Sequence, residues 1–422
     1  PEGNVNNNPN LLAILECCYT QGFSIDILSE TQKGRYQKRQ DFFRLRLVKD
    51  LGCLIRWRNS MFFAQYFLNK IYEKIGCHYD LIIGIDREGL LIAESITQVS
   101  GTPLALISYE ILFADEVGQE IKREEREASE RISFAVCQGG LRTEKLSEEN
   151  GIPKSKIIDF PVSSREEKFS FKRSDWIREK FGIEPERKIA LYMGSLESWA
   201  GFDRIIDDLE NWPDNWALVL HGRFKGSSQY KKLEQLSRKA RKKVVVSDQP
   251  FERYQDVYVL PQSADLGLAL YSPDWKGPLT GNNLEYLGWA SGKVCTYLQC
   301  GLPILVNEIG EIADTCRAAD FGYVLPDGKT LSKLLEGVEK NELMGKGQNA
   351  RNYFKEHLDF DKHSSKLLEQ IEKLTRSETR REGPDWDHLT KKINMFYYLS
   401  FGPVFYISRP TKKIIRRVIN KI

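Results

Sequence analysis

The sequence lacks the features that mark several large classes of protein. No apolar run reaches the roughly 18–20 residues that a membrane-spanning helix needs. The first ten residues do not show the basic, apolar and small-residue pattern of a secretory signal. The 62 basic and 59 acidic side chains nearly cancel, so the strongly basic face of a nucleic-acid-binding protein is not expected. These absences indicate a cytoplasmic protein without a nucleic-acid partner.

Disulfide and metal-site patterns are missing as well. None of the eight cysteines stands in a Cys-x-x-Cys pair, and none has a histidine at metal-ligand spacing. Most cysteines lie inside apolar patterns, for example in residues 132–137. We therefore expect buried free thiols and no metal site.

The composition is that of a folded protein, with 41% hydrophobic and 29% charged residues. At about 100–200 residues per domain, 422 residues predict two domains, or three. Short apolar runs alternate with helix-length segments such as 91–100, 202–211 and 230–242. The runs form two series: 24–28, 81–85, 104–108, 132–136 and 156–159, then 189–193, 217–221, 244–247, 266–270 and 304–307.

This alternation predicts an α/β fold with two Rossmann-like domains that face each other across a cleft. Each domain has a parallel sheet with helices on both faces. The polar stretch 161–187 separates the two series as a linker with one short helix. We predict an N-terminal domain over residues 1–165, a C-terminal domain over 166–375 and a tail over 376–422. Ligands of such sheets bind beyond the carboxyl ends of the strands.

The tail combines aromatic and basic residues. Residues 393–407 are rich in aromatics, and basic residues surround the apolar face formed by Ile414, Ile415, Val418, Ile419 and Ile422. A cationic amphipathic helix indicates docking on an anionic membrane surface through residues 393–422. A tail that packs across both domains is the alternative.

Two glycine-containing turns follow strands of the second series. In the first, Gly194 and Gly201 flank Ser195, and a helix follows. In the second, Arg223 follows His221, and its guanidinium suits a phosphate. A plain strand–helix turn and a solvated basic loop are the respective alternatives, and His221 is expected to be packed rather than catalytic.

The third pattern is the most specific. A polar loop with Asn282 and Asn283 leads to Ser291, Gly292 and Lys293 at the start of a helix, which ends before Gly301-Leu302-Pro303. Free amides at a helix N-terminus, with a hydroxyl and an ammonium, can hold a diphosphate. The P-loop spacing is absent, and a capped structural helix is the alternative.

In this order and spacing, the three patterns resemble the C-terminal half of GT-B glycosyltransferases, and most closely the family 4-like group that uses nucleotide-diphosphate sugars. The stretches 80–86 and 106–110 resemble strands of the acceptor-side half. The resemblance covers about residues 4–368. It implies that the first strand of the fold is missing before Pro1.

The resemblance implies a metal-independent transferase without a cofactor, whose co-substrate is a nucleotide-diphosphate sugar. Donor-binding candidates are Gly194, Ser195, Arg223, Asn282, Asn283, Ser291, Gly292 and Lys293. Glu110 and Asp86 are candidates for the catalytic base of an inverting reaction, because both stand at predicted strand ends. Each could instead orient the acceptor or cap a helix.

The sequence departs from the family at four positions. Relatives carry phosphate-binding Arg and Lys where Ser195 and Ala200 stand, and two glutamates where Gly288 and Thr296 stand; Glu285 is a nearby substitute. We therefore weigh three functions. The first is a glycosyltransferase for cell-surface polysaccharide or glycolipid synthesis, with a saccharide or lipid-linked acceptor. The others are a nucleotide-sugar epimerase and a catalytically silent paralogue that binds a nucleotide sugar or a partner enzyme.

The charged run 120–131 is expected to be a solvated helix face.

Overall fold

The computed structural model describes residues 8–29, 44–47, 79–165, 173–222, 233, 243–247, 251 and 254–375. Three predicted features lie outside these residues: Arg223, the helix expected over 230–242 except for Leu233, and the tail over 376–422. No helix in the described part of the chain is long and apolar enough to cross a membrane.

The N-terminal half contains a four-stranded sheet in which every neighbouring pair is parallel. Its order is β3 (Ile82–Ile85), β4 (Leu104–Ile107), β5 (Ile132–Cys137) and β6 (Ile157–Asp159). A separate parallel pair is formed by β1 (Asp26–Ser29) and β2 (Arg44–Leu47). The helices are α1 (Pro9–Thr20), α4 (Asp86–Ser100), α5 (Ala114–Val117), α6 (Gln119–Ser129) and α7 (Gly140–Asn150), with the 3-10 turn η2 (Lys154–Lys156).

The C-terminal half contains a six-stranded parallel sheet of order β12-β11-β10-β7-β8-β9. The strands are β7 (Lys188–Met193), β8 (Trp216–His221), β9 (Val244–Ser247), β10 (Leu266–Ala269), β11 (Ile304–Asn307) and β12 (Gly322–Leu325). The α-helices are α8 (Trp176–Phe181), α9 (Phe202–Asp207), α11 (Val259–Ser263), α12 (Asn282–Glu285), α13 (Gly292–Gln299), α14 (Gly310–Ala319), α15 (Leu331–Glu336) and α16 (Lys340–Tyr353). Short turns of helix are η3 (Ser198–Ala200), η4 (Leu209–Asn211), η5 (Tyr254–Tyr258), η6 (Gly288–Ala290) and η7 (Phe354–Leu358).

Alternate residues of each strand enter opposite core layers, because side chains alternate along a strand. In β4, Ala105 and Ile107 pack with α1, while Leu104 and Leu106 pack with residues of α4. In β7, Ile189 and Leu191 lie in one cluster and Ala190 and Tyr192 in another. Both sheets are therefore covered on both faces, and the predicted fold class is confirmed.

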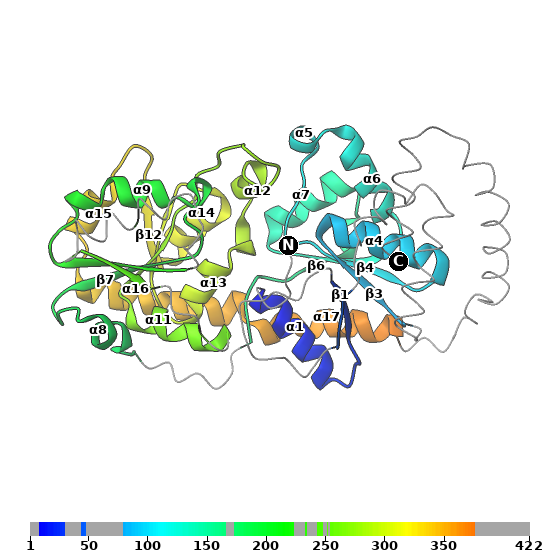
Figure 1. Cartoon of the computed structure of the whole chain (residues 1–422), viewed down its shortest axis with the longest axis horizontal. Coiled ribbons are helices and arrows are strands. Elements are labelled where there is room, and N and C mark those ends of the chain that lie inside the picture. The colour runs from blue at the N-terminus through cyan, green and yellow to red at the C-terminus, as the bar shows by residue number, and fades with distance from the viewer. Residues whose placement is uncertain are drawn as a thin grey trace, which may run out of the picture.

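The last described helix, α17 (Phe360–Thr375), returns to the N-terminal half. Its residues Phe360, Leu367 and Ile371 share a core cluster with Leu11 and Ile14 of α1. Figure 1 shows α17 beside α1, under the sheet that contains β3 and β4, while β7 and β12 lie on the other side of the molecule. The chain thus crosses between the halves a second time after the C-terminal half is complete.

The predicted helix 202–211 is interrupted. It divides into α9 and η4, and Asp208 stands between them. The Asp208 carboxylate accepts hydrogen bonds from the amide and the hydroxyl of Ser332, at 2.6 and 2.9 Å. Asp208 thereby caps the start of α15, a long-range contact that local helix propensity does not indicate.

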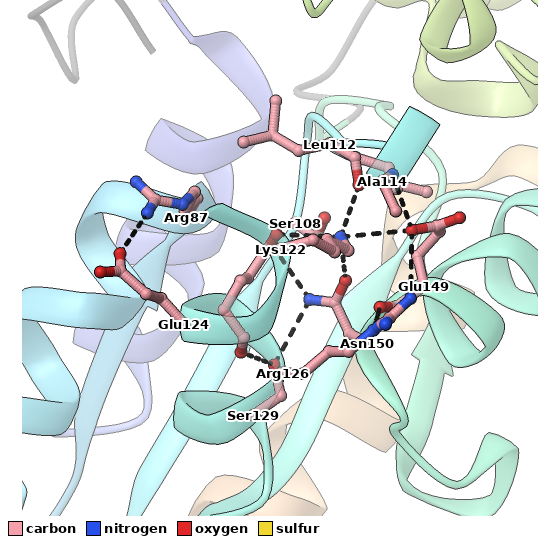
Figure 2. A network of polar contacts seen from close by, with 12 residues as sticks. Arg87, Ser108, Leu112, Ala114, Lys122, Glu124, Arg126, Ser129, Glu149 and Asn150 are labelled. Atoms are coloured by element: carbon pink, nitrogen blue, oxygen red, sulfur yellow. Dashed lines mark hydrogen bonds and ion pairs between the residues drawn. The ribbon is translucent and has the colours of Figure 1, made fainter. Parts of the chain in front are cut away.

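The charged run 120–131 has the expected solvated face, on which Glu120, Arg123, Glu127, Glu130 and Arg131 are exposed, but two of its charged residues depart from the prediction. Lys122 and Glu125 of α6 are buried, and the Lys122 ammonium contacts the Leu112 carbonyl at 2.5 Å, Glu125 at 2.9 Å and Asn150 at 2.5 Å. Figure 2 shows this network, in which Glu149 also accepts from the Ala114 amide at 3.1 Å. These bonds hold the loop after β4 against α6 and α7. We call this group of side chains the Lys122 network.

The described cysteines are free thiols, as expected. The buried ones are Cys17, Cys18, Cys137, Cys295 and Cys316, while Cys300 is partly exposed.

Candidate functional site

The predicted Ser-Gly-Lys helix start is present as the N-terminus of α13. Ser291 is the N-cap, and its hydroxyl accepts from the Val294 amide at 3.2 Å and is hydrogen-bonded to the Tyr271 hydroxyl. Within the described residues, the amides of Gly292 and Lys293 have no protein acceptor. The first turn of α13 thus keeps donors free for an anion.

Lys293 stands in this first turn. Its ammonium lies over the rings of Tyr192 and Tyr271, 4.5 and 4.9 Å from their centroids. In the described part of the chain it has no carboxylate partner, and burial lowers the pKa of Lys293 to about 7. A positive charge held by two ring faces and lacking a counterion is prepared for an anionic ligand.

Packing fixes the position of α13. The Tyr297 hydroxyl accepts from the Met193 amide at 3.0 Å and donates to the Leu191 carbonyl at 3.2 Å, which joins α13 to the end of β7. A Cβ at Gly267 of β10 would lie 2.5 Å from the Tyr297 ring. Glycine at this position therefore lets α13 approach the sheet closely.

The first glycine turn lies beyond β7, as predicted. Gly194 is exposed and has a φ of +134°. A Cβ added at this position would have no atom within 4 Å. The Ser195 hydroxyl accepts from the Glu197 amide at 3.2 Å. Because Lys293 lies over Tyr192 in the same strand, these residues stand near the start of α13.

The second turn is described only up to Gly222. His221 is buried at the end of β8, where its ring lies 3.1 Å from the Ser247 hydroxyl and packs against Phe251. His221 is therefore a packed strand-end residue, as expected. Arg223 follows outside the described residues.

The two predicted asparagines are bound to the N-terminal half. The Asn282 amide donates to Glu116 at 2.6 Å, and its side chain donates to Asp115 at 3.1 Å. The Asn283 side chain donates to Glu110 and accepts from the Ile111 amide at 3.0 Å. We call residues 109–116 and 142, with residues 281–286, the seam between the halves. These asparagines thus join the loop 281–286 to the N-terminal half.

The two candidate bases differ in their contacts. One oxygen of Asp86 accepts from the amides of Tyr109 and Glu110 at 2.6 and 2.9 Å, at the start of α4, and burial raises its pKa. Glu110 is partly exposed and one of its oxygens accepts from Asn283, while burial raises its pKa too. Asp86 therefore supports the loop that carries Glu110.

Arg142 of α7 was not predicted. It is fully buried and donates to the carbonyls of Tyr109 and Asn283, at 2.7 and 3.2 Å. The two carbonyls belong to different halves, 174 residues apart in the chain (283 − 109). No local motif marks such a residue, and its only sequence signal is an arginine shortly after a predicted strand.

No group of three His, Cys, Asp or Glu side chains in the described ranges could hold a metal ion. Metal independence stays a prediction.

Comparisons with known proteins agree with this geometry. Residues 174–357 match the model of the family described as glycosyl transferases group 1. No curated protein is similar in sequence.

Solved structures extend the likeness to both halves. WaaG, a glycosyltransferase involved in lipopolysaccharide biosynthesis, has a TM-score of 0.59 and 19% identity over 88% of this chain and 96% of its own. Anabaena HepE in complex with UDP and glucose has a TM-score of 0.64 and 12% identity, over 88% and 98%. Sucrose-phosphate synthase from Thermosynechococcus elongatus has a TM-score of 0.61 and 14% identity, over 86% of this chain and 91% of its own. These likenesses show the GT-B fold.

Proposed function

We propose that this chain transfers a sugar from a nucleotide-diphosphate donor to a saccharide or lipid-linked acceptor. The premise is that residues 174–357 are a glycosyl transferases group 1 domain and that the chain is a GT-B glycosyltransferase. The HepE structures contain UDP, glucose and UDP-glucose, which supports a nucleotide sugar as donor here. The acceptor is assigned to cell-surface polysaccharide or glycolipid synthesis, since WaaG has a role in lipopolysaccharide biosynthesis.

The observation that supports this function best is the N-terminus of α13. It combines the unpartnered amides of Gly292 and Lys293 with an ammonium that lacks a counterion. When a sugar–phosphate bond breaks, negative charge develops on the departing diphosphate. Fixed donors and the positive end of the helix dipole stabilise that charge where it forms.

On the acceptor side, Glu110 is the better candidate for the base. One of its oxygens is bound by Asn283, and within the described residues the other has no hydrogen bond. Burial raises the pKa of this carboxyl, which makes it a stronger base toward an acceptor hydroxyl. Asp86 is occupied by two backbone amides and acts as its support.

Nucleotide binding tests the proposal. UDP, GDP and ADP are titrated by calorimetry against the full chain and against Lys293→Met. Loss of a charged phosphate contact is expected to weaken the binding of the preferred nucleotide about 10- to 100-fold. The matched control is Lys333→Met, which removes an exposed lysine of α15 that pairs with Glu336. Equal affinity in Lys293→Met and the parent, or no binding of any of the three, would contradict the proposal.

A silent nucleotide-sugar-binding paralogue is the second candidate, and the missing glutamates favour it. The Thr296 hydroxyl is bonded to the Gly292 carbonyl at 2.7 Å. Gly288 has a φ of +49°, and a Cβ there would lie 3.2 Å from the Gln138 carbonyl. Neither position can present a carboxylate to a ribose. Incubation with UDP-, GDP- and CMP-sugars separates the possibilities: slow hydrolysis indicates a transferase, inversion at C2 an epimerase, and binding without turnover a silent protein.

The tail is assigned to an anionic membrane surface, which would place the enzyme peripherally at the inner face of the membrane. Its sequence pattern supports this, because Lys412, Lys413, Arg416 and Arg417 flank an apolar face. Flotation with phosphatidylglycerol vesicles is expected to recover the full chain and to lose the chain without residues 393–422. Equal recovery of both would exclude this role.

A further inference from the structure

Trp275 is an exposed aromatic residue in a backbone conformation that bulky side chains disfavour. Its side chain is 57% exposed and its φ is +50°. The other non-glycine residues with a positive φ in the described ranges are Asp86 and Asp320, and aspartate tolerates this region better. For a tryptophan the conformation is costly and persists only where the surroundings enforce it.

The loop 272–281 supplies the bonds that enforce it. The amides of Asp274 and Trp275 both donate to the Thr280 carbonyl, at 2.8 and 3.2 Å. The Thr280 amide donates to the Gly277 carbonyl at 3.1 Å, and its hydroxyl accepts from the Gly277 amide at 3.1 Å. The loop thus presents Trp275 on a backbone that is closed by its own hydrogen bonds.

This loop starts beside the proposed diphosphate site. Tyr271, directly before it, lies under the Lys293 ammonium, 4.9 Å from its ring centroid. The Ser198 hydroxyl, which follows the first glycine turn, donates to Asp274 at 3.0 Å. Trp275 stands four residues beyond Tyr271 (275 − 271), so the chain between them spans at most about 14 Å. A short saccharide that reaches the diphosphate site can therefore also reach the indole.

The five-membered ring of the indole packs at the seam. A Cβ at Gly281 would lie 2.6 Å from the indole nitrogen and would overlap a carboxylate oxygen of Glu116. Glycine at this position therefore lets the indole and the carboxylate both pack against the backbone. The neighbouring Asp115 is exposed and accepts from the Asn282 side chain at 3.1 Å. The indole thus stands where the loop meets the N-terminal half, with two carboxylates beside it.

An exposed aromatic face with polar groups at its rim fits a sugar. A pyranose carries C–H groups that pack on an aromatic ring, and its hydroxyls need polar partners at the edge. One oxygen of Glu116 accepts from the Asn282 amide at 2.6 Å. The other is buried and has no hydrogen bond within the described residues. A hydroxyl donor would satisfy this oxygen.

The charge around Trp275 disfavours anions. Asp115 and Glu116 both carry carboxylates, and the one lysine of the loop, Lys276, pairs with Asp274 at 3.4 Å. A phosphate or an anionic lipid headgroup would be repelled by the two carboxylates, whereas a neutral sugar would not. The position therefore fits a neutral pyranose better than a membrane surface.

We propose that Trp275 is a stacking platform for a neutral pyranose of the acceptor, and that Glu116 binds one of its hydroxyls. The inference rests on the proposed function, because sugar transfer is what brings an acceptor to the seam. It makes that function more specific, since it places a saccharide, and not a charged headgroup, next to the loop 272–281.

Three variants of the full chain test the platform. Trp275→Asn removes the ring and keeps a residue that tolerates a positive φ, while Trp275→Phe keeps an aromatic face. Tyr19→Ala is the control, because it removes a 52% exposed aromatic side chain from α1. The probes are the methyl β-glycosides of glucose, galactose and N-acetylglucosamine, with methyl β-glucuronide as the anionic comparison. Saturation-transfer NMR titrations in the presence of UDP measure their affinities.

The parent is expected to bind at least one neutral glycoside and to bind the glucuronide more weakly. Loss of the stack should weaken glycoside binding about tenfold in Trp275→Asn. Trp275→Phe should stay within about threefold of the parent, and Tyr19→Ala should match it. The affinities of UDP, GDP and ADP should be the same in all four proteins. The urea midpoint of Trp275→Asn should not fall below that of the parent, because the ring is exposed and the new residue relieves strain.

Several results would overturn the inference. Unchanged glycoside affinity in Trp275→Asn is one, and a parent that binds a nucleotide but none of the neutral glycosides is another. Weaker binding of UDP-glucose by Trp275→Asn, with UDP unchanged, would assign the ring to the donor sugar. A lower urea midpoint would assign it to folding, and lost flotation with phosphatidylglycerol vesicles would assign it to lipid. A parent that binds none of the nucleotides refutes the proposed function instead, and the glycoside titrations without UDP then still decide whether Trp275 binds a sugar.

Discussion

Lys293 should make nucleotide binding depend on pH. Burial lowers the pKa of its ammonium to about 7, so the free protein carries a mostly neutral amine at about pH 8. A diphosphate favours the charged form, so binding raises this pKa and takes up a proton above about pH 7. The contribution of Lys293 to affinity is therefore complete below that pH and falls as the pH rises.

Calorimetry in buffers of different ionisation enthalpy measures this proton. Uptake of close to one proton is expected at about pH 8 and little at about pH 6. Lys293→Met should show none of the uptake at either pH, whereas Lys333→Met should behave as the parent does. Uptake that persists in Lys293→Met would assign the proton to another group.

Single residues of the site could be predicted from the sequence where the signal is local. Ser291 is an N-cap because a serine before a helix accepts from the amide three residues on. Arg142 could not be predicted, because its partners lie far from it in the sequence: Tyr109 is 33 residues away, and Asn283 is 141 residues away. Asn282 and Asn283 stood in the predicted loop, but their bonds to Asp115 and Glu110 depend on how the two halves meet.

At the scale of elements, parallel strands were predictable because they are buried on both faces and read as short apolar runs. Ile304–Asn307 was found in full, while Gly322–Leu325 was missed because it begins with a glycine, which strands disfavour, and leaves an apolar run of only three residues. Buried charges were not predictable, because a run of charged residues predicts an exposed helix face. Lys122 and Glu125 lie within such a run, and their neighbours in it are exposed. Only the loop packed over them distinguishes their face of α6.

The Lys122 network should be important for stability. Lys122→Met removes the ammonium but leaves Glu125 buried and the Leu112 carbonyl without its donor. Breaking a buried pair in this way is expected to lower the free energy of unfolding by about 3–5 kcal/mol. Urea unfolding followed by circular dichroism measures the change.

The neighbouring residue offers the matched control. Arg123 is exposed on the same helix and lies 3.8 Å from Glu127, so Arg123→Met should change the free energy of unfolding by less than about 0.5 kcal/mol. A Lys122→Met protein as stable as Arg123→Met would show that the network contributes nothing net.

At the scale of the whole molecule, α17 connects the end of the C-terminal half to the core of the N-terminal half. Phe360 begins this helix, is buried, and packs edge-on against Phe160, with ring centroids 5.3 Å apart. Phe360→Ala leaves a cavity between the helix and the N-terminal sheet and should cost about 3–5 kcal/mol. Because Phe360 shares its core cluster with residues of α1, the loss should appear first as faster hydrogen exchange in α17 and α1, before α13 is affected.

Met344→Ala on α16 is the control, since Met344 is 68% exposed and its removal leaves no cavity. Unchanged protection of α1 in Phe360→Ala would mean that the return of α17 does not stabilise the N-terminal half.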